Sequence, residues 1–228
     1  MTLKEFLDGI VTLPAALIAI AVLLGSTNII ARLSPEKEIQ KSLGTVPYFR
    51  AGRTFGYEPQ QLYAMLDVFN QKPDEEAQGE AKEEANKETK KEMDGEALRN
   101  AYLKFFSYDF IYPLIYGFSM ALIIAYLQKK WNTEGSGNGL EAIRGHYLWA
   151  LPLVAMVFDY AENISLIHVI KNYRGEPMPG WVGFSRWMTM FKLVLVYASY
   201  LLCSWLVLLL VRDLWKCLSK MMGAKQPG

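Results

Sequence analysis

Four apolar stretches, each of about 22 to 25 residues, stand out in the pattern of hydrophobic and polar positions. They cover residues 10–31, 107–128, 146–170 and 187–211. The hydrocarbon core of a bilayer is about 30 Å thick, and roughly 20 mostly apolar residues in a helix cross it. The pattern therefore predicts an all-α protein, a four-helix transmembrane bundle. The N-terminus belongs to the first helix segment (1–31), and a C-terminal tail follows the fourth helix (212–228).

Residues 32–106 have a different, mainly polar pattern and predict an extramembrane segment between the first and second spans. Ser34 followed by Pro35 is typical of a helix start and predicts a short helix over 34–43. Residues 56–71 predict an amphipathic helix, because apolar residues recur on one face at spacings of four and three. The members of that face are Leu62, Leu66 and Phe69.

The stretch 71–96 holds ten acidic residues and five lysines, which predicts a charged disordered insert or a solvated helix. From about Glu96 a helix is expected to resume and to run into the second span. The formal net charge of the whole chain is only +1, so the sequence gives no reason to expect nucleic acid as a partner.

An even number of spans places both termini on one side of the membrane. Lysines and arginines are balanced between the two sides, and a weak preference for cytoplasmic termini rests on Lys129, Lys130 and Arg212, which directly follow apolar stretches. A cleaved signal peptide is a less favoured alternative for the first stretch, because Glu5 and Asp8 precede it. The expected partners are the lipid bilayer and either a homo-oligomer or another membrane protein.

Polar residues inside the predicted helices form the candidate site. Ionisable groups in a span cost a few kcal/mol each on insertion scales, so each needs a partner or a task. All lie in the halves of the helices that face the extramembrane segment. Asp159, Glu162 and Asn163 share one face of the third predicted helix, at spacings of three and four. Asp109, Tyr112 and Tyr116 share one face of the second, at spacings of three and seven. The full set is Asn28, Asp109, Tyr112, Tyr116, Asp159, Glu162, Asn163 and Lys192.

Two interpretations of this polar cluster are open. The polar groups can pair across helices and fix their packing, with Lys192 extending to the interface. Alternatively they line a cavity that holds a lipid headgroup, an ion or a proton. Three acids cannot all pair with one lysine, so Asp159 or Glu162 is expected to hold a proton. Asp159, Glu162 and Asp109 are therefore the candidate catalytic residues.

Known catalytic and cofactor motifs are absent from the sequence. Neither histidine follows a glutamate by three residues, as a di-iron helical bundle would require. There is no HExxH, GxSxG, P-loop or GxGxxG pattern. We therefore expect no metal and no cofactor.

Three segments carry a resemblance: FGYEPQQLYAMLD, LRNAYLKFFSYDFIYPLIYG and LPLVAMVFDYAENI. Together they resemble a group of small bacterial-type four-span membrane proteins with YDxxFPxxY-like and DxxEN-like spans, which has no assigned activity. The resemblance covers about residues 55–211. The positions of its motifs fall on Asp109, Pro113, Tyr116, Asp159, Glu162 and Asn163, and the resemblance names no reaction. This chain departs from that group at residues 71–96, because it has a charged insert where a short turn would be expected.

Three functions remain open from the sequence. The favoured one is a multi-pass, non-enzymatic membrane component with a polar intramembrane cluster. The first alternative is a membrane-embedded enzyme that acts on a lipid or small apolar metabolite, with Asp159 or Glu162 as acid and base. The second is a small oligomeric proton-coupled transporter, which must oligomerise because four spans are few for one chain.

Overall fold

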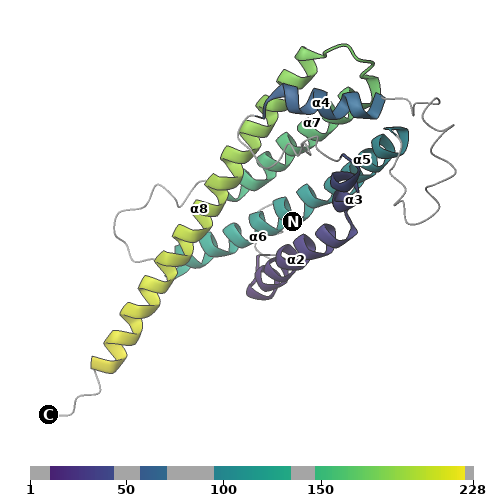
Figure 1. Cartoon of the computed structure of the whole chain (residues 1–228). Helices are drawn as coiled ribbons and strands as arrows, with labels where there is room; N and C mark the ends of the chain where they lie inside the picture. The colour runs from purple at the N-terminus through teal and green to yellow at the C-terminus, as the bar shows by residue number, and fades with distance from the viewer. Residues whose placement is uncertain (1–10, 44–56, 71–94, 135–146, 224–228) are drawn as a thin grey trace, which may run out of the picture. The chain divides into compact units, whose positions relative to one another are not determined.

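The computed structural model describes residues 11–43, 57–70, 95–134 and 147–223, and all regular structure in them is helical (Figure 1). The fold class predicted from the sequence is therefore confirmed as all-α for this part of the chain. The helices are α2 (Leu13–Leu33), α3 (Glu36–Ser42), α4 (Pro59–Asn70), α5 (Gly95–Asp109), α6 (Ile111–Glu134), the short 3₁₀ helix η3 (Leu148–Ala150), α7 (Leu151–Asn172) and α8 (Pro179–Gly223).

Three helical stretches among the described residues are long and apolar enough to cross a membrane. They are Gly95–Trp131, Leu148–Asn172 and Pro179–Arg212. A further apolar stretch, Leu13–Ser26 in α2, is shorter. The structure thus shows three candidate spans and one shorter apolar helix where the sequence predicted four spans.

The helices that contain the predicted spans at 107–128 and 187–211 are longer than the spans themselves. The stretch Gly95–Trp131 has 37 residues and includes α5, so the predicted resumption of helix near Glu96 is confirmed. Helix α8 has 45 residues and begins at Pro179, eight residues earlier than expected. Proline is favourable at the first position of a helix, where its missing N–H costs no hydrogen bond.

The helix that enters the second span is interrupted at Phe110, between α5 and α6. Pro113 explains the interruption, because it has no N–H to donate to the carbonyl of Asp109 four residues earlier. A side chain from α7 occupies the break: the Tyr160 hydroxyl donates a 2.7 Å hydrogen bond to the Phe110 carbonyl. The ring centroids of Phe110 and Tyr160 also lie 5.5 Å apart.

The chain divides into two compact units. Unit 1 comprises Met1–Asn28, Pro113–Val157 and Phe191–Gly228, and unit 2 comprises Ile29–Tyr112 and Phe158–Met190. The core of unit 1 is formed by apolar residues of α2, α6 and α8, with Ile124 and Leu206 almost fully buried.

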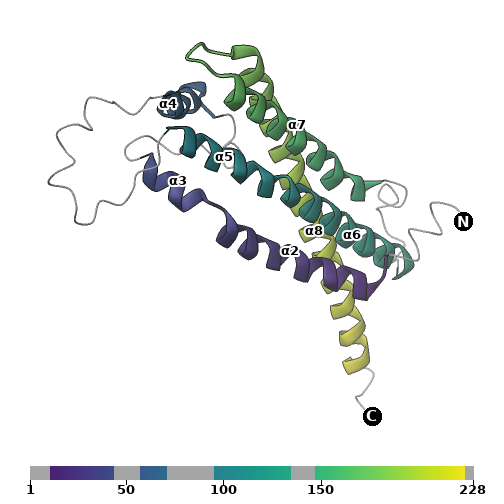
Figure 2. The same cartoon turned by 90° about the vertical axis from the view of Figure 1, so that its right-hand side faces the viewer.

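Unit 2 has its own core, in which α3 and α4 pack against α5 (Figure 2). The core also includes residues from the end of α7 and the start of α8. Helix α4 confirms the amphipathic helix predicted over 56–71, with slightly narrower bounds. Its buried face consists of Leu62, Met65, Leu66 and Phe69.

Helix α3 lies within the helix predicted over 34–43, and the Ser34 hydroxyl accepts a 3.3 Å hydrogen bond from the Glu36 N–H at its start. The predicted charged insert at 71–96 falls on residues 71–94, which lie outside the described part of the chain; Gly95 and Glu96 begin α5.

Candidate functional site

The buried polar face of α7 forms the centre of the candidate site. Asp159, Glu162 and Asn163 lie in the part of α7 that belongs to unit 2 and are 6%, 1% and 2% exposed. Their spacings of three and four place them on one side of the helix. The next turn of this side continues with Leu166, which belongs to the unit 2 core. The acids are therefore embedded among packed side chains.

Tyr57 joins this face from the segment that precedes α4. Tyr57 is 3% exposed, and its hydroxyl donates a 3.2 Å hydrogen bond to the Val182 carbonyl at the start of α8. The side chain of Ser185 and the charge of Glu162 both act on the same hydroxyl. Tyr57 therefore lies where α7 and α8 face each other within unit 2.

The surroundings of Tyr57 keep its hydroxyl protonated. Burial raises the pKa of Tyr57 to about 12 from its ordinary value of 10, and the negative charge of Glu162 acts in the same direction. The contact with Ser185 and the charge of Arg186 oppose the increase but do not cancel it. At neutral pH the hydroxyl is therefore a hydrogen-bond donor and carries no charge.

Asn163 Nδ2, near this centre, makes no hydrogen bond within the described part of the chain. Ser185 interacts with the Tyr57 hydroxyl, which also donates to the Val182 carbonyl. Buried polar groups are nearly always hydrogen-bonded in proteins, so an atom such as Asn163 Nδ2 is typical of functional sites or of positions filled by ordered water.

The other predicted site residues are divided between the two units. Asp109 and Tyr112 lie in unit 2, both half-buried, at the end of α5 and the start of α6. The interruption at Phe110 divides the helix face that was expected to carry them with Tyr116. Tyr116 and Lys192 lie in unit 1 and are 6% and 7% exposed.

Asn28 lies in α2 of unit 1, and its side chain is outside the described part of the structure. The structure therefore unites the α7 residues with Tyr57 and Ser185, which the sequence did not suggest. The expectation that Lys192 meets the acids of α7 stays a prediction.

Hydrogen bonds and one ring contact connect helix α4 to the turn between α7 and α8. Tyr173 donates a 2.6 Å hydrogen bond to Asp67, and its ring stacks on Tyr63 with 5.7 Å between centroids. The Tyr63 hydroxyl accepts a 3.1 Å hydrogen bond from the Met178 N–H. Asn70 donates a 3.5 Å hydrogen bond to the Tyr173 carbonyl. These contacts fix the position of the segment that carries Tyr57.

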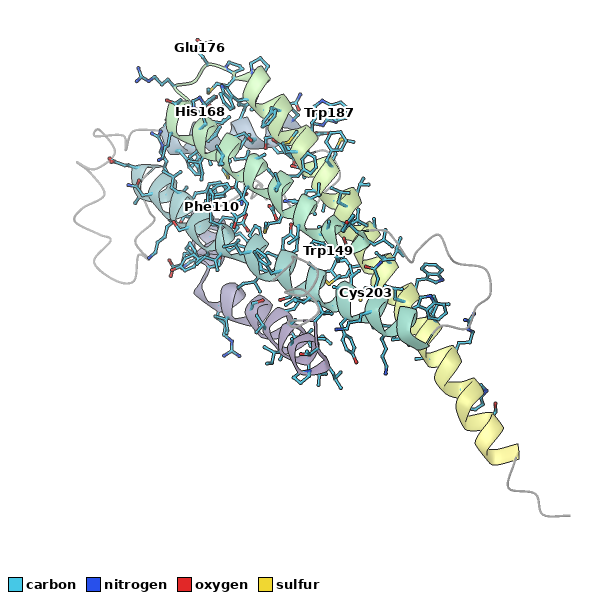
Figure 3. The ribbon with its side chains drawn as sticks, turned by 180° about the vertical axis from the view of Figure 1, so that it is seen from behind. Phe110, Trp149, His168, Glu176, Trp187 and Cys203 are labelled. Carbon is cyan, nitrogen blue, oxygen red and sulfur yellow. The ribbon has the colours of Figure 1, made fainter. Side chains whose placement is uncertain are left out.

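The outer side of the same hairpin carries aromatic residues. His168 on α7 packs against Trp181 on α8, with 4.3 Å between ring centroids. Glu176 lies in the turn between these helices, near the end of α7 that carries His168 (Figure 3). Trp181 and Trp187 are both exposed. Tryptophans of this kind are typical of the boundary between membrane and water.

Among the described residues, no group of three or more histidine, cysteine or acidic side chains is placed to hold a metal ion. No family model, curated protein sequence or solved structure matches the chain. The chemistry of the site is therefore inferred from its own residues: Glu162 can accept hydrogen bonds or a proton, and Tyr57 can donate a hydrogen bond.

Proposed function

We propose that the protein is a multi-pass integral membrane protein with four spans and a non-enzymatic role. In this proposal the polar cluster joins the extramembrane segment to the membrane helices. The observation that carries it is the enclosure of Glu162. Glu162 is 1% exposed, and it acts electrostatically on Tyr57, which lies outside the candidate spans.

The length of α2 supports a fourth span. It has 21 residues, which corresponds to about 32 Å of helix and is enough to cross a hydrocarbon core of about 30 Å. Four spans place both termini on the same side. The cytoplasmic side is preferred because Lys129, Lys130 and Arg212 all lie at the ends of apolar helix segments opposite the extramembrane segment.

The enclosure of the acids favours a structural role over catalysis. A membrane enzyme that uses Asp159 or Glu162 as acid or base needs its substrate within hydrogen-bond reach of the carboxyl group. Both side chains are more than nine-tenths buried in the described structure. Packed polar groups of this kind are common at contacts between membrane helices.

One observation favours the enzyme as a second candidate. Asn163 Nδ2 is buried without a hydrogen bond, so a substrate group that entered the cluster would find a donor available. In that case Glu162 or Asp159 would transfer the proton, and Asn163 would orient the substrate.

Labelling of single cysteines from each side of the membrane tests the span number. In a chain without Cys203 and Cys217, we would place one cysteine at a time by Thr2→Cys, Ala77→Cys, Ser136→Cys and Gln226→Cys. Four spans require positions 2, 136 and 226 to react from one side and position 77 from the other. Reaction of positions 2 and 77 from the same side would show that α2 does not cross.

Complementation tests the non-enzymatic role. In cells with a phenotype caused by loss of the gene, the Glu162→Gln variant should restore function, because glutamine keeps the shape of the side chain but cannot transfer a proton. Removal of residues 71–94 should abolish function if this segment docks a partner. The opposite pair of results would support the enzyme. Expression and membrane insertion of both variants would be compared by immunoblot of membrane fractions.

A further inference from the structure

One end of unit 1 brings together the end of α6, the start of α2 and the last part of α8. The Arg212 guanidinium lies over the Trp131 ring, with 5.6 Å to the ring centroid. Lys129 Nζ donates a 3.3 Å hydrogen bond to the Val11 carbonyl, just before α2 begins. All four residues belong to unit 1. The basic residues that end the apolar parts of α6 and α8 therefore lie at the same end of one packed unit.

The charge at this end of unit 1 is mainly positive. The segments 129–134 and 212–223 contain five basic residues against two acids, Glu134 and Asp213. Lys130 and Arg212 have exposed side chains. We call this set the basic end of unit 1, and its members are Lys129, Lys130, Arg212, Lys216 and Lys220. An excess of positive charge at the end of apolar helices is complementary to a negatively charged membrane surface.

Within unit 1, the last turns of α8 project past the end of α6 (Figures 1 and 2). Arg212, Lys216 and Lys220 recur every four residues, so the helix places them on one side. From the first to the last of them the helix rises about 12 Å, and the headgroup layer on each side of a bilayer core is about 5–8 Å thick. Charges screen each other over about 8 Å at physiological salt. All three positions therefore lie within electrostatic reach of lipid phosphates.

Trp215 favours lipid over a soluble acidic partner at this surface. It follows Arg212 by three residues and is 68% exposed. Tryptophan is enriched where a membrane meets water, because its ring is apolar and its N–H is polar. A helix with both basic residues and tryptophan is typical of contact with anionic lipid. A nucleic acid or an acidic protein would match the charge but would offer no apolar layer for the ring.

We propose that the basic end of unit 1 binds the headgroups of anionic phospholipids. Arg212 and Lys130 contact the phosphate layer, and Lys216 and Lys220 extend the contact along α8. A guanidinium group can hold a phosphate through two parallel hydrogen bonds, and an ammonium group binds it as a point charge. The inference goes beyond the proposed function, because it selects one class of lipid. It requires α6 and α8 to cross the membrane but does not require α2 to do so.

Energy transfer from one fluorophore to labelled lipids tests the proposal. The full-length chain with Cys203→Ser, Cys217→Ser and Ser219→Cys carries the donor at an exposed position near the end of α8. It is reconstituted in phosphatidylcholine vesicles with a trace of phosphatidylglycerol that carries the acceptor on its acyl chain. Parallel vesicles contain the same amount of phosphatidylcholine with the same acceptor. The ratio of the two transfer efficiencies measures the enrichment of anionic lipid.

We expect this ratio to be about threefold or more at low salt. Joint replacement by Lys130→Gln, Arg212→Gln, Lys216→Gln and Lys220→Gln should lower it to about one, because the attraction is electrostatic. A ratio of one in the chain that keeps these four residues would overturn the proposal. Raising the salt from about 0.01 M to about 1 M shortens the screening length from about 30 Å to about 3 Å and should also remove the enrichment.

Lys171→Gln with Arg174→Gln is the matched control. Both residues are exposed and basic but belong to unit 2, so this variant should keep the full enrichment. An equal loss in the control and in the fourfold variant would show that total charge, and not the basic end of unit 1, attracts the lipid.

Two further variants separate charge from packing. Arg212→Lys keeps the charge and should retain most of the enrichment. Lys216→Gln with Lys220→Gln leaves Arg212 over Trp131 and should give an intermediate ratio, so it tests the proposal even if the fourfold variant fails to insert. Full enrichment in this double variant would contradict a role for α8.

Inorganic phosphate, added at constant ionic strength, distinguishes lipid from free phosphate. It should leave the enrichment unchanged, and loss of enrichment would show that the surface binds free phosphate instead. Failure of the four-span topology would appear in the labelling of positions 2 and 77 and would not change the lipid ratio, so the two results are independent.

Discussion

Tyr173 donates a 2.6 Å hydrogen bond to the Asp67 carboxylate and so joins the turn after α7 to helix α4. Hydrogen bonds to charged groups contribute about 1.5–3 kcal/mol when they are well formed. We expect Tyr173→Phe to lower the free energy of unfolding by about 1.5–2 kcal/mol, the lower part of that range, because this bond is only partly buried. Thermal unfolding in detergent followed by circular dichroism measures the change.

The ring of phenylalanine can still stack on Tyr63, so Tyr173→Phe isolates the hydroxyl. Asp67→Asn is the matched variant on the other helix, because asparagine can still accept the hydrogen bond but carries no charge. Asp67→Asn should lower the free energy of unfolding by less than Tyr173→Phe does. Equal stability of all three proteins would show that this contact does not hold α4 in place.

Alkaline pH should weaken unit 2 through two tyrosines. Burial raises the pKa of both Tyr57 and Tyr173 to about 12 from the ordinary value of 10. A raised pKa in the folded state means that the folded protein binds the proton more tightly than the unfolded chain does. The resulting stability is complete below pH 10 and is lost as the pH rises towards 12.

Ultraviolet absorbance of tyrosinate checks this prediction. Two tyrosines should ionise about two pH units later than an ordinary tyrosine. Tyr57→Phe and Tyr173→Phe should each remove one late-ionising group. If both variants keep the full late transition, other tyrosines cause it.

The turn between α7 and α8 depends on Gly175, which has a φ of 92°. A side chain at this left-handed backbone conformation costs roughly 1–2 kcal/mol. No atom lies within 4 Å of the position that a Cβ would take, so the cost of Gly175→Ala is conformational and not steric. We expect a loss of about 1 kcal/mol in thermal unfolding, and no comparable loss for the neighbouring control Glu176→Ala, whose side chain is exposed.

Close packing within unit 1 depends on Gly117 of α6. A Cβ at this position would lie 3.1 Å from both Cβ and Sδ of Met156 on α7. Gly117→Leu should destabilise the protein by about 1–3 kcal/mol through overpacking. Adding Met156→Ala should restore part of the loss, which a double-mutant cycle measures. Gly25→Leu is the control, because nothing lies within 4 Å of its Cβ position, and it should not lower stability.

Much of the helical structure could be predicted from local sequence. The face formed by Leu62, Leu66 and Phe69 is buried as the spacing indicated, and Pro59 marks the start of that helix. These features depend only on residues within one helix. The early start of α8 was missed because Gly180 and Arg186 interrupt the apolar run, although neither residue prevents a helix.

The site was only partly predictable for a related reason. The α7 residues Asp159, Glu162 and Asn163 were found because charged and amide groups are rare in apolar helices. Tyr57 has no periodic pattern around it, and its hydrogen-bond partner is 125 positions further along the chain. The pattern Gly-Tyr-x-Pro before an amphipathic helix was the one local signal, and it indicated a helix start without indicating where the ring would lie.

The length of helix α8 affects how it fits a bilayer. Its apolar stretch, Pro179–Arg212, has 34 residues, which correspond to about 51 Å, well beyond a hydrocarbon core of about 30 Å. In a bilayer this excess is met by tilting of the helix, by local thickening of the lipid, or by placing its first turns above the core. Each response depends on membrane thickness, so thin and thick bilayers would impose different strain on the turn that holds α4.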